Sequence, residues 1–364
     1  MGDPAKSPPS PAKSPTKFPT PAAPGGSPPT ASSPTHDTAP LAVDENPDED
    51  NDDQGIAVGA ESDTTSIKSS ILRYREENGR TYHAYKDGAY VLPNDETENE
   101  RLDLQHTIFL LTFDDSLHCA PLDKQAPRVL DAGCGTGIWS VEFADEHPDA
   151  HVTGVDLSPI QPAFVPPNVS FLIDDIEDNW SFSTPFDFIF TRFMTGSIQD
   201  FPRFFRQSFD NLTPGGTIEL QDCIYPMSCD DGTMTEDSAL LQWSTLLNEA
   251  FRGNKRPMDT ALHYEQQLAD AGFINIQVVR DRWPVNRWPR DKKYKQLGIW
   301  TLENALLSLS SLTLALFTRP RSENGLGWTR EEVEVLLADV RRDLKDTNIH
   351  AYVRIWSVYA QKPV

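Results

Sequence analysis

Apolar and polar residues alternate along the chain in a way that predicts short strands separated by helical segments. The apolar runs are rich in Val, Ile, Leu and Phe, while the stretches between them have apolar residues three or four positions apart. Strands connected through helices in this order form βαβ crossovers and a mainly parallel sheet. The predicted strands are residues 128–132, 152–156, 169–173, 186–191, 216–221, 274–279 and 351–359. We therefore expect an α/β fold with a Rossmann-like doubly wound sheet, made of five parallel strands and a terminal pair that contains an antiparallel edge.

Helical patterns surround this sheet. Asn94 or Asp95 is suited to cap a helix that continues to about Leu111. Further helices are predicted over residues 138–146, 238–252, 261–271 and 330–344. The last of these starts with the capping-box pattern of Thr329 and Glu332 and belongs to a helical insertion, at about 283–347, that we expect to act as a lid. The longest apolar stretch, residues 300–317, is interrupted by polar residues and suits a buried helix better than a membrane span.

Composition divides the chain into three regions. Residues 1–66 contain 13 of the 30 prolines and carry 3 − 11 = −8 formal charges, so they cannot bury enough apolar surface to offset their ordering entropy. We expect a disordered tail there, first Pro/Ser-rich and then acidic. Residues 67–126 form an N-terminal helical prelude, and residues 127–364 form the main domain with its insertion.

Charge and cysteine usage limit the class of protein. The chain has 32 Lys and Arg against 55 Asp and Glu, a formal net charge of −23, which argues against direct binding to nucleic acid. Its four cysteines form no CxxC pair, and the first residues lack the apolar core of a secretory signal. We expect a soluble protein of a reducing compartment, cytoplasmic, with the nucleus as the alternative.

The strongest chemical signal follows the first predicted strand. That strand carries Asp131 and leads into a turn with Gly133, Gly135 and Gly137, and Asp156 stands nineteen residues later at the end of the next strand. Glycines let the backbone approach a ligand, a helix start offers free N–H groups, and a strand-end acid accepts the two hydroxyls of a ribose. A dinucleotide fingerprint would need a third glycine one position later, where the chain has Ile138. The pattern therefore predicts a nucleoside-binding site.

Here the sequence resembles the class I S-adenosylmethionine (SAM)-dependent methyltransferases. The resemblance rests on residues 129–137 as the glycine motif, 154–158 as the ribose acid, 174–177 as the adenine loop and 212–216 as the turn before the fifth strand. Outside these motifs, residues 77–83, 92–96 and 160–162 are similar to the fungal subgroup that includes LaeA, a regulator of secondary metabolism. The resemblance covers about residues 71–363.

The resemblance implies SAM as the cofactor and a set of residues that bind it. The glycines would wrap the amino-acid part of SAM, Asp156 would hold the ribose, and Asp175 with the Ile176 backbone would contact the adenine. Asp131 would organise the loop. The exit of the fourth strand, Thr191 with Arg192 and Phe193, would line the methyl-transfer region. The complete set of expected cofactor-binding residues is Asp131, Gly133, Gly135, Gly137, Asp156, Asp175, Ile176 and Thr191.

Methyl transfer is an in-line displacement that demands alignment and exclusion of water. The donor is already activated, so no metal is required, and a general base is needed only for a hydroxyl or a protonated amine. Because the prelude often closes over the site in this family, Tyr82 and His83 are candidate catalytic residues beside Arg192, with Arg80 nearby. His83 is equally consistent with a packed structural residue.

The acceptor is less constrained by the motifs. We expect a methyltransferase that acts on a small molecule of the secondary-metabolite type. The alternative is a LaeA-like regulator that acts through protein partners in the nucleus, and a third possibility is a SAM-binding protein without turnover. Trp283, Trp288 and Trp300 would either line an aromatic acceptor pocket or pack in the core and lid.

Overall fold

The structure is a computed structural model that describes residues 39–44, 75–77, 80–82, 94–122 and 127–364. Most of the predicted tail lies outside these residues. One short segment of it does not, since Val43 forms a β-bridge with Pro289 and the Asp44 N–H donates to the Trp288 carbonyl at 2.8 Å. This part of the predicted tail therefore pairs with the start of the insertion.

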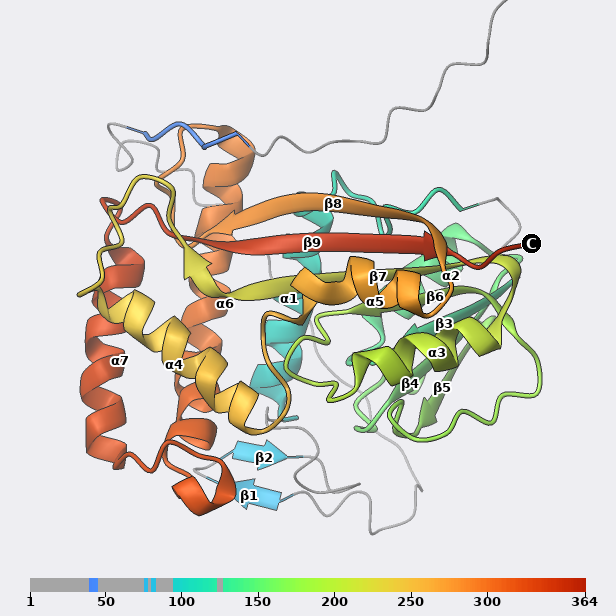
Figure 1. Cartoon of the computed structure of the whole chain (residues 1–364), viewed down its shortest axis with the longest axis horizontal. Coiled ribbons are helices and arrows are strands. Elements are labelled where there is room, and N and C mark those ends of the chain that lie inside the picture. The colour runs from blue at the N-terminus through green and yellow to red at the C-terminus, as the bar shows by residue number, and fades with distance from the viewer. Residues whose placement is uncertain (1–38, 45–74, 78–79, 83–93, 123–126) are drawn as a thin grey trace, which may run out of the picture. The chain divides into compact units, whose positions relative to one another are not determined.

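A seven-stranded sheet forms the centre of the fold (Figure 1). Its strands are ordered β5 (Val169–Ile173), β4 (His151–Asp156), β3 (Arg128–Ala132), β6 (Phe186–Arg192), β7 (Leu212–Ser228), β9 (Tyr352–Gln361) and β8 (Ile274–Pro284). The first five strands are parallel, and β9 is antiparallel to both of its neighbours. The predicted α/β doubly wound sheet is confirmed.

The position of the antiparallel strand differs from the prediction. The sheet ends on β8, and antiparallel β9 lies between β7 and β8. The two strands differ in burial: most of β9 is buried, whereas the first half of β8 is largely exposed. An interior strand is covered on both faces and flanked on both sides, which suits the more apolar sequence of β9.

Helices cover both faces of the sheet because neighbouring strand residues point in opposite directions. Val129 packs in one core cluster with residues of α1 (Glu96–Thr112) and α2 (Ile138–Glu146). Leu130 packs in the other with residues of α3 (Phe201–Asn211) and α5 (Tyr264–Asp270). A short 3-10 turn, η1 (Thr260–His263), leads into α5.

The helices α4 (Ala239–Gly253), α6 (Lys292–Phe317) and α7 (Arg330–Lys345) gather at the carboxyl ends of β7 and β8 (Figure 1). The last two, joined through the 3-10 turn η2 (Arg321–Glu323), lie between β8 and β9 in the chain. Among the described residues, α6 alone is long and apolar enough to cross a membrane by composition. It packs against α1, α4, α7 and β8, and many of its side chains are buried there.

Local sequence signals locate several helix starts correctly. Asp95 caps α1 by accepting the Glu98 N–H, and Thr329 forms the predicted capping box with Glu332. The prelude also contains an antiparallel hairpin of β1 (Arg75–Glu77) and β2 (Arg80–Tyr82), which the helical prediction lacked. Helix α3 was not predicted either, and β7 is far longer than expected because its partner β9 pairs along most of its length.

Candidate active site

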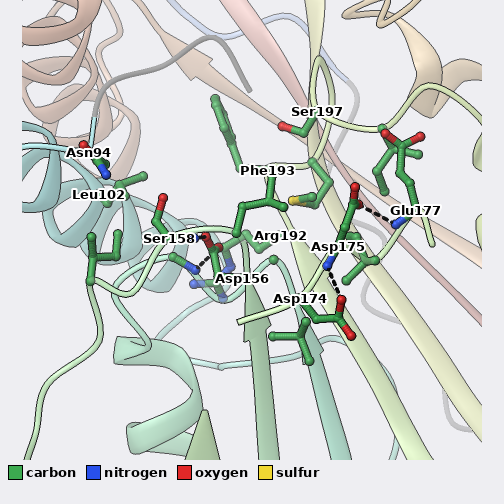
Figure 2. Close-up of a pocket in the computed structure, with 18 of the residues that line it drawn as sticks. Asn94, Leu102, Asp156, Ser158, Asp174, Asp175, Glu177, Arg192, Phe193 and Ser197 are labelled. Atoms are coloured by element: carbon green, nitrogen blue, oxygen red, sulfur yellow. Dashed lines mark hydrogen bonds between the residues drawn. The ribbon is translucent and has the colours of Figure 1, made fainter. Parts of the chain in front are cut away.

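A cavity that opens to solvent lies where the carboxyl ends of β3, β4, β5 and β6 meet. The strand order reverses at β3: β4 and β5 lie on one side of it in the sheet, and β6 and β7 lie on the other side. Open α/β sheets bind ligands at such a reversal of strand order. Figure 2 shows Asp156 near the middle of the lining, with Asp174, Asp175 and Glu177 on one side and Leu102 and Asn94 on the other.

The glycine turn after β3 takes a backbone path that side chains would block. Gly133 and Gly137 both have φ of +80°. A Cβ at Gly133 would lie 2.4 Å from Met194 Sδ, and one at Gly137 would lie 2.4 Å from the Phe171 ring. Gly133 and Gly135 line the cavity. Gly137 is the N-cap of α2 and lies against the Phe171 ring. It therefore allows the sharp turn between β3 and α2.

Asp156 stands at the end of β4 with its carboxylate turned toward the glycine turn. One oxygen accepts the Gly135 N–H at 2.8 Å and the other accepts the Ser158 N–H at 2.9 Å. Burial raises the pKa of Asp156 to about 6, although these backbone hydrogen bonds favour the ionised form. Each carboxylate oxygen retains a lone pair, so both can also accept from a vicinal diol.

The loop after β5 forms another wall. The Asp175 carboxylate accepts the Glu177 N–H at 2.8 Å, and Asp174 accepts the Asp175 N–H at 2.8 Å. Glu177 pairs with Arg256 at 2.9 Å, which fixes the far end of this loop. The Ile176 carbonyl accepts the Trp180 indole N–H at 2.9 Å, which holds the Ile176 backbone in the loop. Asp175 and Ile176 both line the cavity, as a nucleobase site requires.

Asp131 and Thr191 lie behind the cavity wall. Asp131 is 3% exposed, accepts the Ser140 hydroxyl at 2.6 Å and has a pKa raised by burial to about 7. Thr191 is fully buried and donates its hydroxyl to the Ala132 carbonyl at 2.8 Å. Thr191 therefore joins β6 to β3 and does not line the cavity. Asp131 is next to the glycine turn, within a smaller hollow shared with Gly133 and Gly135.

Arg192 borders the cavity, but its guanidinium is held by the protein. It donates to the Gln221 side chain at 2.9 Å and the Leu117 carbonyl at 3.3 Å, and its third partner is His106 Nδ1 at 3.0 Å. It also lies over the Phe109 ring at 4.7 Å. Burial lowers the pKa of Arg192 to about 10, so it stays charged at neutral pH. These contacts give Arg192 a positioning role in the cavity wall, and its catalytic role stays a prediction.

The contact with Arg192 also fixes the state of His106. A guanidinium only donates, so His106 Nδ1 must accept, and the proton is then on Nε2. From there it is donated to Glu142 at 2.8 Å. This chain of contacts joins α1, α2 and β6 beneath the cavity. The sequence contained no signal for it, because the three residues are far apart and belong to no motif.

The catalytic candidates of the prelude lie at the limit of the described residues. His83 lies outside them, and for Tyr82 and Arg80 only the backbone in β2 is described. The strand itself is next to the cavity, since the Thr81 carbonyl accepts the Asn94 N–H at 2.8 Å and its hydroxyl donates to Asn94 Oδ1 at 3.0 Å. Asn94 lines the cavity, is 7% exposed and has no described partner for Nδ2.

Two further side chains hold the glycine turn in place. Gln161 donates to the carbonyls of Gly135 at 2.7 Å and Ser158 at 2.9 Å, and so connects the turns after β3 and β4. Thr136 donates to Asp103 of α1 at 2.8 Å. Gln161 belongs to the segment 160–162 that marked the fungal subgroup, although its contacts were not predicted. The glycine turn, the strand-end acid and this support define a nucleoside-binding α/β protein.

Comparisons with known proteins identify the family. The model of a methyltransferase domain matches residues 104–278. Methyltransferase pytC of Aspergillus terreus is 41% identical over 84% of this chain and 94% of its own. The laeA protein of Emericella nidulans, named both a protein-methionine methyltransferase and a secondary metabolism regulator, is 36% identical over 82% of this chain and 79% of its own. The phosphoethanolamine N-methyltransferase 2 of Haemonchus contortus, solved with SAM, is 17% identical over 73% of this chain and 53% of its own, with a TM-score of 0.40. The chain belongs to the SAM-dependent methyltransferases, in the group that contains pytC and laeA.

The cavity suits SAM, the cofactor of this family. In a complex with SAM, Asp156 would accept from the ribose diol, the Asp175–Ile176 turn would contact the adenine edge, and the glycine turn would contact the amino-acid part, as the sequence predicts. The Asn94 amide has no partner among the described residues and would donate to a carboxylate or a hydroxyl oxygen. Among the described residues, no group of His, Cys, Asp and Glu is arranged to hold a metal ion.

Proposed function

We propose that this protein transfers the methyl group of SAM to a small molecule of the secondary-metabolite type. The observation that carries this proposal is a second, mainly apolar cavity beside the first. Phe193 and Ser197 line both cavities. A concave, mainly apolar hollow is typical of a small-molecule site, whereas peptides are more often bound along extended grooves. An acceptor in the second cavity would approach the donor through the wall formed by Phe193.

The chemistry requires alignment more than acid–base catalysis. Bound SAM would supply a methyl group on a positively charged sulfur. A lone pair on the acceptor oxygen or nitrogen would form the new bond to carbon as the carbon–sulfur bond breaks, and the electron pair of that bond would stay on the sulfur of S-adenosylhomocysteine. The proton of the acceptor group would pass to water. The protein holds the two partners in line and excludes water.

Phe193 is well placed to separate donor and acceptor. It adopts φ of +57°, an uncommon conformation for a residue with a side chain, and its N–H donates to the Gln221 carbonyl at 2.8 Å. Its ring stands edge-on to Phe109, with centroids 6.4 Å apart. The backbone contact holds Phe193 where the two cavities meet.

A regulator that methylates protein is the second candidate, and the likeness to laeA supports it. In that case partners in the nucleus would supply the acceptor, and the second cavity would receive one side chain. The pytC likeness is 41% identical and covers 94% of that relative, compared with 36% and 79% for laeA.

Methyl transfer from labelled SAM distinguishes the two. The full chain is incubated with a metabolite extract and, separately, with the protein fraction of the source organism, and Asp156→Ala serves as the matched inactive control. We expect label in an organic-soluble product of the metabolite fraction that is absent with the control. Label found only in protein would overturn the small-molecule proposal in favour of the regulator.

A further inference from the structure

The walls of the second cavity, which we name the acceptor cavity, are aromatic. Trp243 of α4 and Trp283 of β8 both line it. Their indole N–H groups are used elsewhere: Trp243 donates to Thr313 at 2.8 Å and Trp283 donates to Thr112 at 2.7 Å. Consequently these side chains offer the cavity ring surface and no hydrogen-bond donor. Flat aromatic walls of this kind bind aromatic ligands by stacking and edge contacts.

The charge in the cavity is compensated inside the protein. Among the described lining residues, only Arg101 carries a charge. Its guanidinium pairs with Glu98 at 2.6 Å, and both side chains are 3% exposed. It also donates to Asn304 at 3.0 Å, which connects α1 to α6. An anionic ligand would have to disturb a buried, satisfied ion pair, which is costly. The cavity therefore suits a ligand without net charge.

One buried hydroxyl in this cavity has no hydrogen-bond partner among the described residues. Thr301 of α6 lines the cavity and is 4% exposed, and its Oγ1 has no hydrogen-bond partner among the described residues. Ser308, seven residues later on the same helix face, provides a contrast, because its hydroxyl donates to the Asn304 carbonyl at 3.0 Å. Buried hydroxyls are nearly always hydrogen-bonded, so the Thr301 hydroxyl requires a partner that enters the cavity.

We propose that the acceptor is an uncharged aromatic molecule that carries a hydroxyl or carbonyl oxygen, and that Thr301 recognises this oxygen. The inference rests on the proposed function and adds the class of substrate. The oxygen held by Thr301 anchors the acceptor at α6. The atom that receives the methyl group lies at the opposite end of the acceptor, toward Phe193 and Ser197, where the two cavities meet. Thr301 is therefore a specificity residue that does not take part in bond making.

Binding of simple probes to the full chain tests this inference without knowledge of the natural acceptor. Calorimetry with saturating SAM present measures the affinities of 2-naphthol, naphthalene and 2-naphthoate, which share a ring system and differ in polarity. We expect 2-naphthol to bind at least 10-fold more tightly than either of the others. Thr301→Val should remove most of that advantage and leave naphthalene binding unchanged, and Thr301→Ser should restore it.

Ser308→Ala is the matched control, because the hydroxyl lost there serves only the helix backbone. We expect it to bind 2-naphthol like the wild type, and all three variants to bind SAM with wild-type affinity. Wild-type binding of 2-naphthol by Thr301→Val, tightest binding of 2-naphthoate, or competition between 2-naphthol and SAM would each overturn the inference. The proposed function fails separately, through the absence of methyl transfer, and that outcome is read from labelled SAM and not from probe binding.

Discussion

Replacement of Asp156 by asparagine is the sharpest test of the donor site. The wild-type carboxylate accepts one N–H from each of the two turns that it joins, those of Gly135 and Ser158. An asparagine oxygen can replace only one of these contacts, because the amide nitrogen donates and would face the other N–H group. The same argument applies to the ribose, which needs an acceptor for each of its two hydroxyls.

The Asp156→Asn substitution should weaken SAM binding strongly and change the free energy of unfolding only a little. One lost hydrogen bond to a charged acceptor costs about 1.5–3 kcal/mol, which weakens SAM binding roughly 10- to 150-fold. In the free protein, burial raises the pKa of Asp156 from 3.8 to about 6. Ionisation of the folded form at pH 7 thus costs about 3 kcal/mol, a cost that the neutral asparagine avoids. Loss of a backbone contact offsets this gain by about 1–3 kcal/mol, so the free energy of unfolding changes little.

Calorimetry with SAM and urea unfolding of the free protein measure the two effects on one variant. We expect Asp156→Asn to unfold within about 2 kcal/mol of the wild type and to bind SAM at least 10-fold more weakly. Asp156→Ala should bind more weakly still, since it retains neither acceptor. SAM affinity within threefold of the wild type for Asp156→Asn would refute the assignment of the ribose to this residue.

Three other predictions concern residues that support the cavity and two buried carboxyls, Asp131 behind its wall and Asp222 of β7, which accepts the Thr195 N–H at 2.8 Å. Gln161→Met should lower SAM affinity about 10-fold by calorimetry, since it loses both contacts of the amide, and an unchanged affinity would contradict that role. Burial raises the pKa values of Asp131 and Asp222 to about 7. Each carboxyl holds its proton more tightly in the folded protein than in the unfolded chain, so protonation stabilises the fold. The free energy of unfolding, measured with urea, should therefore fall as the pH rises from about 4 to 7. A flat profile would refute this. A lysine in place of Arg192 cannot reach three acceptors at once, so we expect Arg192→Lys to lower the melting temperature and to leave the pH profile of kcat unshifted. A shifted profile would contradict a purely positioning role for Arg192.

The sheet and the donor site could be predicted because their signals are local. A strand, a glycine turn and a helix follow each other within residues 128–146, and the backbone path of the turn demands glycine at Gly133 whatever the rest of the chain does. The order of the last two strands carries no such signal. The sequence predicts both β8 and β9 as strands. Only their packing in three dimensions places the more buried β9 between β7 and the edge strand β8.

Support for the site was harder to predict than the site itself. Arg192, His106 and Glu142 come from three elements, and each taken alone is a common charged or polar residue. Their contacts arise because β6 ends beneath α1, a relation that depends on tertiary packing. Thr191 was predicted to contact the cofactor because it lies at the exit of the fourth strand. Its hydroxyl instead donates to the buried Ala132 carbonyl.

The acceptor cavity could not be predicted from local signals, although one of its residues, Trp283, was a candidate. Its lining extends from Arg101 to Val353 and draws on α1, α4, α6 and several strands, so no window of sequence describes it. Of the three tryptophans considered, Trp283 lines the cavity, whereas Trp288 donates to the Ala351 carbonyl at 3.0 Å and packs in the core. The motifs that predict the donor site are local, because each lies at the end of one strand. The acceptor depends on which side chains the insertion brings to α1, and a single unsatisfied hydroxyl on α6 is therefore more informative about it than the motifs are.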